Sequence, residues 1–217
     1  MFEILKTGGF IMIPLVLASV VMIGIILERF WSLRMSSVVP PKLGAEVRQW
    51  ARTAKIEKDH LDKLRQNSPL GAVLATVVAN RQRSRDVISD KVQATGRQVV
   101  HRLSRYLNTL GTIAIISPLL GLLGTVSGLI RMFLVITTAG IGDANALAGG
   151  IGEALVATAA GLCVACVGYF FHRHFKGHVQ NLAMALEHEA NLLMDSLEAP
   201  DPVAAPVPAP APQRAAR

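Results

Sequence analysis

Long runs of predominantly apolar residues dominate the pattern of this chain. Three of them, at residues 10–28, 107–136 and 144–172, have the roughly 20 residues that a helix needs to cross about 30 Å of hydrocarbon. Backbone polar groups inside a bilayer must be satisfied within the segment itself, so runs of this kind predict helices. The sequence therefore predicts an all-α membrane protein with three transmembrane helices.

The segments that follow the spans have helical periodicity. Residues 29–106 carry apolar positions at three- and four-residue spacing, interrupted at Asn67-Ser68-Pro69. Neither Gly nor Pro marks the junction with the second span, so we expect one continuous helix to leave the membrane there. The third span continues in the same way through a helix at residues 173–198. The predicted fold thus has two long helices that extend into a cytoplasmic helical domain.

The remaining segments are short or low in complexity. Residues 1–9 precede the first span, and no small-residue cleavage site follows that span, so we expect it to be retained as a membrane helix. Residues 137–143 form the short loop between the second and third spans. Residues 199–217 are rich in Pro and Ala, which is typical of a disordered or extended tail.

Composition and charge add an orientation to this picture. The chain is 51% hydrophobic and only 17% charged, with a net charge of +7, as expected of a membrane protein. Basic residues far outnumber acids between the first two spans, whereas residues 137–143 contain no basic residue. The positive-inside rule then predicts a periplasmic N-terminus and a cytoplasmic C-terminus. The basic residues alternate with acids and lack interleaved aromatics, so no nucleic-acid partner is expected.

Two charged residues, Arg131 and Glu153, interrupt the apolar spans. A charge at membrane depth is costly, which makes each of them a functional candidate. If Thr125 and Thr158 lie at one level of antiparallel helices, Arg131 lies about 9 Å and Glu153 about 7.5 Å further toward the periplasm. The two could form an ion pair within or between subunits. Alternatively, Arg131 could extend to the lipid headgroups while Glu153 faces the bundle alone.

Small residues follow one face of each of the last two spans. Such faces let helix backbones approach closely, and this packing accounts for the glycines. A threonine on the same face has two possible roles. It can be structural, with its hydroxyl bonded to a carbonyl of its own helix, or its hydroxyl can be functional. The residues for which close packing is predicted are Gly121, Gly124, Gly128 and Gly161, and the two threonines are Thr125 and Thr158.

Other reactive side chains favour ordinary structural roles. Cys163 and Cys166 form a C-x-x-C in mid-span without further ligands, which favours helix packing over zinc or redox chemistry. His172 and His174 lie at the predicted cytoplasmic edge of the third span, where polar side chains anchor the interface. The sequence therefore predicts no metal site, no cofactor and no enzymatic activity.

Two segments resemble the signature segments of the MotA/TolQ/ExbB proton-channel family. They are residues 117–126, SPLLGLLGTV, and residues 150–162, GIGEALVATAAGL. The resemblance covers all three spans, and the first segment is more similar to the ExbB branch than to TolQ. Arg131 is not a hallmark of either segment.

The resemblance implies a bacterial inner-membrane subunit, pentameric in the family, that converts the proton motive force into work. The pentamer would surround an ExbD-like partner with an intramembrane aspartate and act on a TonB-like protein, which drives uptake of nutrients such as iron chelates. By the same resemblance, Thr125 and Thr158 are pore-facing hydroxyls and Glu153 is the family's acid near the periplasmic side. A TolQ-like role in envelope maintenance and a passive membrane scaffold are the alternatives.

Overall fold

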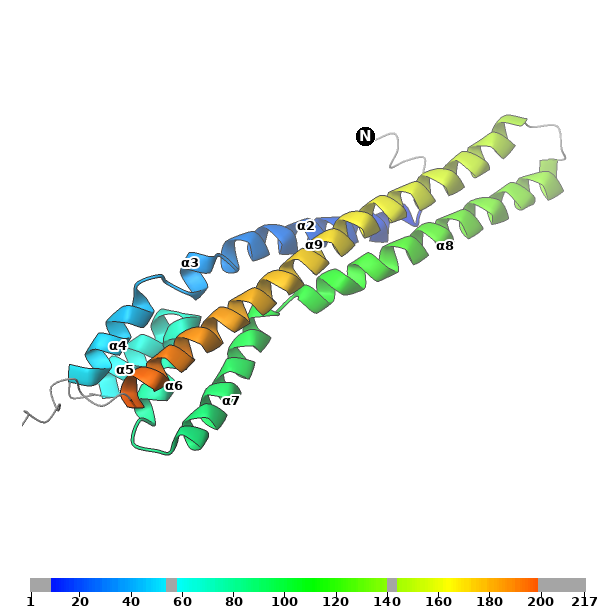
Figure 1. Cartoon of the computed structure of the whole chain (residues 1–217). Helices are drawn as coiled ribbons and strands as arrows, with labels where there is room; N and C mark the ends of the chain where they lie inside the picture. The colour runs from blue at the N-terminus through cyan, green and yellow to red at the C-terminus, as the bar shows by residue number, and fades with distance from the viewer. Residues whose placement is uncertain (1–8, 54–57, 140–143, 199–217) are drawn as a thin grey trace, which may run out of the picture. The chain divides into compact units, whose positions relative to one another are not determined.

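The computed structural model describes residues 9–53, 58–139 and 144–198, and within them every regular element is a helix. The predicted Pro/Ala tail, most of residues 1–9 and most of the loop at 137–143 lie outside the described residues. The elements, labelled in Figure 1, are α2 (Met12–Ser32), α3 (Met35–Val38), α4 (Leu43–Thr53), α5 (Lys58–Asn67), α6 (Pro69–Ala79), α7 (Arg85–Leu103), α8 (Leu107–Ala139) and α9 (Ala144–Glu198).

Three of these helices, α2, α8 and α9, are long and apolar enough to cross a membrane. Their outer faces carry large apolar side chains that protein does not cover: Leu17, Phe133 and Leu155 are each more than 60% exposed. Such a surface is costly in water and suited to lipid. Within the described residues, the predicted all-α fold with three apolar helices long enough to span a membrane is confirmed.

The chain divides into two compact units. The first contains residues 1–38 and 97–184, and the second contains residues 39–96 and 185–217. The first unit therefore holds α2, α8 and the apolar part of α9. The 55 residues of α9 form one helix, in agreement with the apolar spacing that runs on from the third span.

Aromatic packing joins α2 to α9 in the first unit. The ring of Phe30 lies edge-on to Phe175, with centroids 5.2 Å apart, and to Phe171 at 5.7 Å. One turn further along α9, the His178 ring nitrogen Nε2 bonds to the carbonyl of Leu33 at 2.8 Å. This bond satisfies a carbonyl at the end of α2 that no helical partner reaches.

The expectation of a continuous helix from the cytoplasmic loop into the second span is wrong. α7 ends at Leu103 and α8 begins at Leu107, and between them Tyr106 has a φ of 64°. A bulky residue rarely adopts this left-handed backbone conformation, because its Cβ crowds the following carbonyl. Tyr106 therefore marks a real break in the helix.

The break is stabilised by Arg29, an arginine of α2 that is only 4% exposed. Its Nη1 donates a hydrogen bond to the carbonyl of Leu103 at 2.9 Å, and its guanidinium lies 5.5 Å from the centre of the Tyr106 ring. Neighbouring Glu28 balances the charge at 2.7 Å. These tertiary contacts explain why local sequence, which contains no Gly or Pro at 103–107, did not predict the break.

The strain at Tyr106 can be measured with two substitutions that both remove the ring. We expect the Tyr106→Gly protein to be about 1 kcal/mol more stable than the Tyr106→Ala protein, because only alanine retains the Cβ that opposes a positive φ. Thermal unfolding of the purified protein in detergent compares the two. Equal melting temperatures would show that this junction carries no backbone strain.

The second unit is organised around α6, whose leucine and valine residues are all buried. Ser68 caps this helix by accepting a hydrogen bond from the Gly71 N–H at 3.0 Å, and Pro69 occupies the first turn, as is favoured at helix starts. The interruption predicted at Asn67-Ser68-Pro69 is therefore the junction of α5 and α6. Arg81, just after α6, donates to the Ala51 carbonyl of α4 at 3.0 Å.

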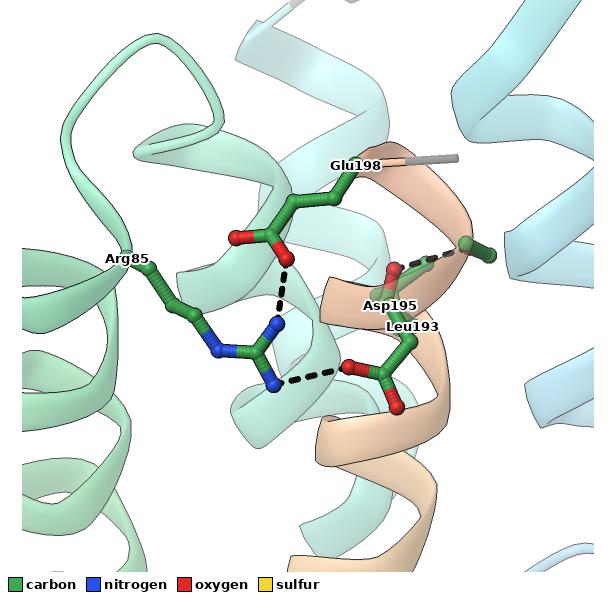
Figure 2. Close-up of polar contacts among 5 residues, drawn as sticks. Arg85, Leu193, Asp195 and Glu198 are labelled. Atoms are coloured by element: carbon green, nitrogen blue, oxygen red, sulfur yellow. Dashed lines mark hydrogen bonds and ion pairs between the residues drawn. The ribbon is translucent and has the colours of Figure 1, made fainter. Parts of the chain in front are cut away.

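An ion cluster joins the start of α7 to the end of α9 within the second unit (Figure 2). Arg85 Nη2 lies 2.8 Å from Asp195 Oδ1, and Arg85 Nη1 contacts the carboxylate of Glu198. The hydrogen bonds to Asp195 and then Glu198 raise the pKa of the guanidinium above its usual range. All three side chains are exposed, so solvent screens the cluster, and it orients the helix ends more than it stabilises them.

Candidate functional site

The candidate site is the contact between α8 and the first half of α9, which run antiparallel as neighbours (Figure 1). The backbones of the two helices approach each other most closely at Gly161. A Cβ on this residue would lie 2.6 Å from the Ser117 carbonyl oxygen and 3.0 Å from the Gly121 Cα. Since these neighbours are backbone atoms, only glycine permits the two helices to approach this closely.

The other glycines predicted to pack closely behave in the same way. A Cβ on Gly121 would lie 3.1 Å from the Thr158 Cα, and one on Gly124 would collide with the Ala157 side chain. A Cβ on Gly128 would lie 2.8 Å from the carbonyl oxygen of Gly150, a glycine that the sequence reasoning did not single out. The resulting row of contacts is called the glycine seam below.

Thr158 bonds across the glycine seam. Its Oγ1 donates to the carbonyl of Gly121 on α8 at 3.1 Å. Thr125 instead donates to a carbonyl of its own helix, that of Leu122, at 2.6 Å. Each of the two hydroxyl protons is thus engaged by a carbonyl of α8, and only the bond of Thr158 crosses the seam.

Arg131 and Glu153 face one another across the same pair of helices. Arg131 Nη1 lies 3.1 Å from both carboxylate oxygens of Glu153. Helical side chains point toward the N-terminus of their own helix. Because α8 and α9 run in opposite directions, the side chains of Arg131 and Glu153 point toward each other and meet. The arginine side chain is 53% exposed and the glutamate 14%. Arg131 therefore both pairs with the acid and extends outward.

Glu153 also lies against Gly9, at the N-terminal end of α2. Gly9 has a φ of 70°, and a Cβ there would collide with the Glu153 carboxylate. The Gly9 carbonyl accepts the hydrogen bond of the Met12 N–H at 3.1 Å, which opens α2. A carboxylate at a helix N-terminus is stabilised by the helix dipole. The sequence signal for this contact was the Gly8-Gly9 pair before the first span, and the sequence reasoning did not use it.

Among the described residues, no group of three or more His, Cys, Asp or Glu side chains could hold a metal ion. Cys163 and Cys166 are exposed free thiols. His172 packs against Gly111 of α8, where a Cβ would lie 3.0 Å from its Nε2.

Fold and site together define a class. Three apolar helices place a glycine seam, two hydroxyls and an ion pair inside apolar spans, as in a membrane protein that handles ions or protons. Residues 62–188, which include α8 and most of α9, match the MotA/TolQ/ExbB proton channel family. The chain belongs to this family, and the family predicted from the sequence is confirmed.

Individual relatives bear ExbB names. The putative biopolymer transport protein ExbB-like 1 of Synechocystis sp. is 37% identical over 171 residues, which cover 75% of this chain and 65% of that protein. The biopolymer transport protein exbB1 of Vibrio cholerae is 42% identical over 93 residues, or 42% of this chain and 41% of that protein. The chain thus spans about two-thirds of the first relative's length and less than half of the second's.

Proposed function

We propose that this protein is the channel and motor subunit of an ExbB-type energy transducer in a bacterial inner membrane. In this proposal a homo-oligomer, pentameric as the family resemblance implies, surrounds the membrane helices of an ExbD-like partner. The partner contributes an intramembrane aspartate that binds protons. The assembly then acts on a TonB-like protein that drives nutrient uptake at the outer membrane.

The observation that carries this proposal is a pair of hydroxyls within the apolar spans: Thr158 bonds across the glycine seam to the Gly121 carbonyl, and Thr125 lies one turn beyond Gly121 on α8. A hydroxyl can donate and accept hydrogen bonds without carrying a fixed charge. It can therefore accept a hydrogen bond from the partner's protonated carboxyl and, once its own hydrogen leaves the α8 carbonyl, donate one to the carboxylate. Glu153 already faces Arg131, so in our proposal it tunes the pathway, and the titrating acid belongs to the partner.

The membrane potential can supply the work that the proposal requires. One proton crossing 100 mV releases about 2.3 kcal/mol. The energy of one such proton already exceeds the roughly 1 kcal/mol net contribution of a single hydrogen bond. Several such contacts could be broken and remade in each cycle. The proposed orientation, with a periplasmic N-terminus and a cytoplasmic C-terminus, follows from the charge distribution of the sequence.

The test replaces the seam hydroxyl at position 158 in the complex of this chain with its partner. We expect Thr158→Val, which is nearly isosteric, to lower proton flux into vesicles at least tenfold, in line with the loss of a group engaged in proton transfer. Thr158→Ser keeps the hydroxyl and is the matched control. Size-exclusion chromatography and thermal melting establish that each variant still assembles.

The outcomes separate the possible roles. Normal flux through an assembled Thr158→Val complex would contradict the proposed role of the hydroxyl. No flux through the unaltered complex would contradict the channel function and favour a passive scaffold. In cells, loss of iron-chelate growth supports the ExbB-type role, whereas detergent sensitivity with normal uptake would indicate a TolQ-type role.

A further inference from the structure

A pocket lies where α2 and α9 reach the end of the apolar spans, close to the Phe30 cluster. Its volume is about 280 Å³. Both apolar and basic side chains line this pocket. All of its lining residues belong to the first unit. Its lining residues are Arg29, Phe30, Leu33, Arg34, Met35, His174, Phe175 and His178.

Arg34 is the residue of this pocket whose charge is unbalanced. It is exposed, and within the described part of the chain its side chain forms no ion pair or hydrogen bond. Arg29, by contrast, is neutralised by Glu28 and bonded to Leu103. Positive charge is thus left over at Arg34, and an arginine without a carboxylate favours a phosphate.

The other walls are held in place by contacts already described. His178 is fixed by its bond to the Leu33 carbonyl at 2.8 Å. The His174 ring stacks on Phe170, at 10° between planes, and meets Phe175 edge-on at a centroid distance of 5.6 Å. Histidine and arginine line the pocket together, and Glu28, the acid nearest in sequence, is paired with Arg29.

Apolar surface leads away from the pocket along the spans. Leu27 of α2 is 66% exposed and Phe170 of α9 is 63% exposed. Trp31, one turn from Leu27 on α2, is 80% exposed, and exposed aromatics of this kind are typical of the boundary between lipid tails and headgroups. A ligand seated here meets basic groups at one end and apolar side chains at the other.

We propose that this pocket binds an anionic phospholipid. Its phosphate contacts Arg34 beside His174, its glycerol region occupies the space lined by Phe30, Leu33 and Met35, and its acyl chains follow the exposed faces of α2 and α9. Basic pockets between membrane helices bind anionic headgroups in this manner. The basic groups give the site preference for phosphatidylglycerol over a zwitterionic lipid.

The test uses the purified complex, stripped of lipid in neutral detergent and then titrated with phosphatidylglycerol, phosphatidylcholine or inorganic phosphate. Native mass spectrometry counts the lipids bound to each subunit, and thermal melting reports the stabilisation. We expect phosphatidylglycerol to bind about five- to tenfold more tightly than phosphatidylcholine, which corresponds to roughly 1 kcal/mol for one arginine near a headgroup.

Two variants of the pocket and one control complete the design. Arg34→Gln is expected to abolish the preference for phosphatidylglycerol, and Met35→Trp, which fills the pocket and keeps every charge, is expected to reduce binding of both lipids. Arg83→Gln, at an exposed arginine of the second unit, is expected to bind as the unaltered protein does.

Each contrary outcome overturns the proposal. Arg34 does not recognise a headgroup if the unaltered protein binds both lipids equally. The same conclusion follows if Arg34→Gln keeps the full preference for phosphatidylglycerol over phosphatidylcholine. Equal stabilisation by inorganic phosphate indicates a free-anion site. A change in subunit number with Met35→Trp, at unchanged lipid content, shows that a neighbouring subunit covers the pocket instead.

Discussion

Replacing Gly161 by alanine is expected to destabilise the protein by about 2 kcal/mol, and replacing it by leucine to prevent assembly. The reason is that the first added carbon already meets the Ser117 carbonyl and the Gly121 Cα. Neither can rotate away as a side chain would, so α8 and α9 must separate along the seam. Overpacking of well-packed contacts costs about 1–3 kcal/mol and occasionally more.

The same helix offers a matched control in Gly152, where an added Cβ meets nothing within 4 Å. Gly152→Ala is expected to leave stability unchanged or raise it by up to about 1 kcal/mol, because alanine is the better helix former. Thermal melting and size-exclusion chromatography in detergent measure both substitutions. If Gly161→Ala melts as Gly152→Ala does, the close approach of the two helices is not present in solution.

The ion pair between Arg131 and Glu153 gives the second large effect. Glu153→Gln or Arg131→Gln is expected to cost about 2 kcal/mol, less than the 3–5 kcal/mol of a fully buried pair because Arg131 is half exposed. The charge swap Arg131→Glu with Glu153→Arg restores the pair. It is expected to recover about half of the loss, since position 153 also lies at the N-terminus of α2, where a cation is disfavoured.

Assembly and melting of the two single variants and the swap are compared with Glu187→Gln, a change at an exposed acid of α9. This control is expected to melt within about 0.5 kcal/mol of the unaltered protein, as surface substitutions usually do. A swap that is no more stable than the single variants would mean that the two charges act independently.

The sequence was sufficient for the features that depend on helix periodicity and length. Three apolar runs became α2, α8 and α9, because a span of that length and composition has no other stable form in lipid. The glycine seam was predictable as well. Small residues that recur at three- and four-residue spacing fall on one face, and that face is where α8 and α9 meet.

Tertiary contacts decided what the sequence did not reveal. The break before α8 depends on Arg29, which lies 74 residues from the Leu103 carbonyl that it binds. The contact of Gly9 with Glu153 joins the start of the first span to the third. Local propensity carries no information about partners so far apart along the chain, so both features required coordinates.

The hydrogen bonds of the two seam threonines have a consequence for any acid that reaches them. Each hydroxyl has one hydrogen, and in both cases a carbonyl of α8 holds it. Only oxygen lone pairs then face an incoming group. A neutral carboxylic acid can donate to them, whereas an ionised carboxylate meets repulsion until a threonine releases its carbonyl. In the assembly proposed above, the resting seam therefore favours the protonated form of the partner's acid, and release of that proton requires a change in the threonine hydrogen bonds.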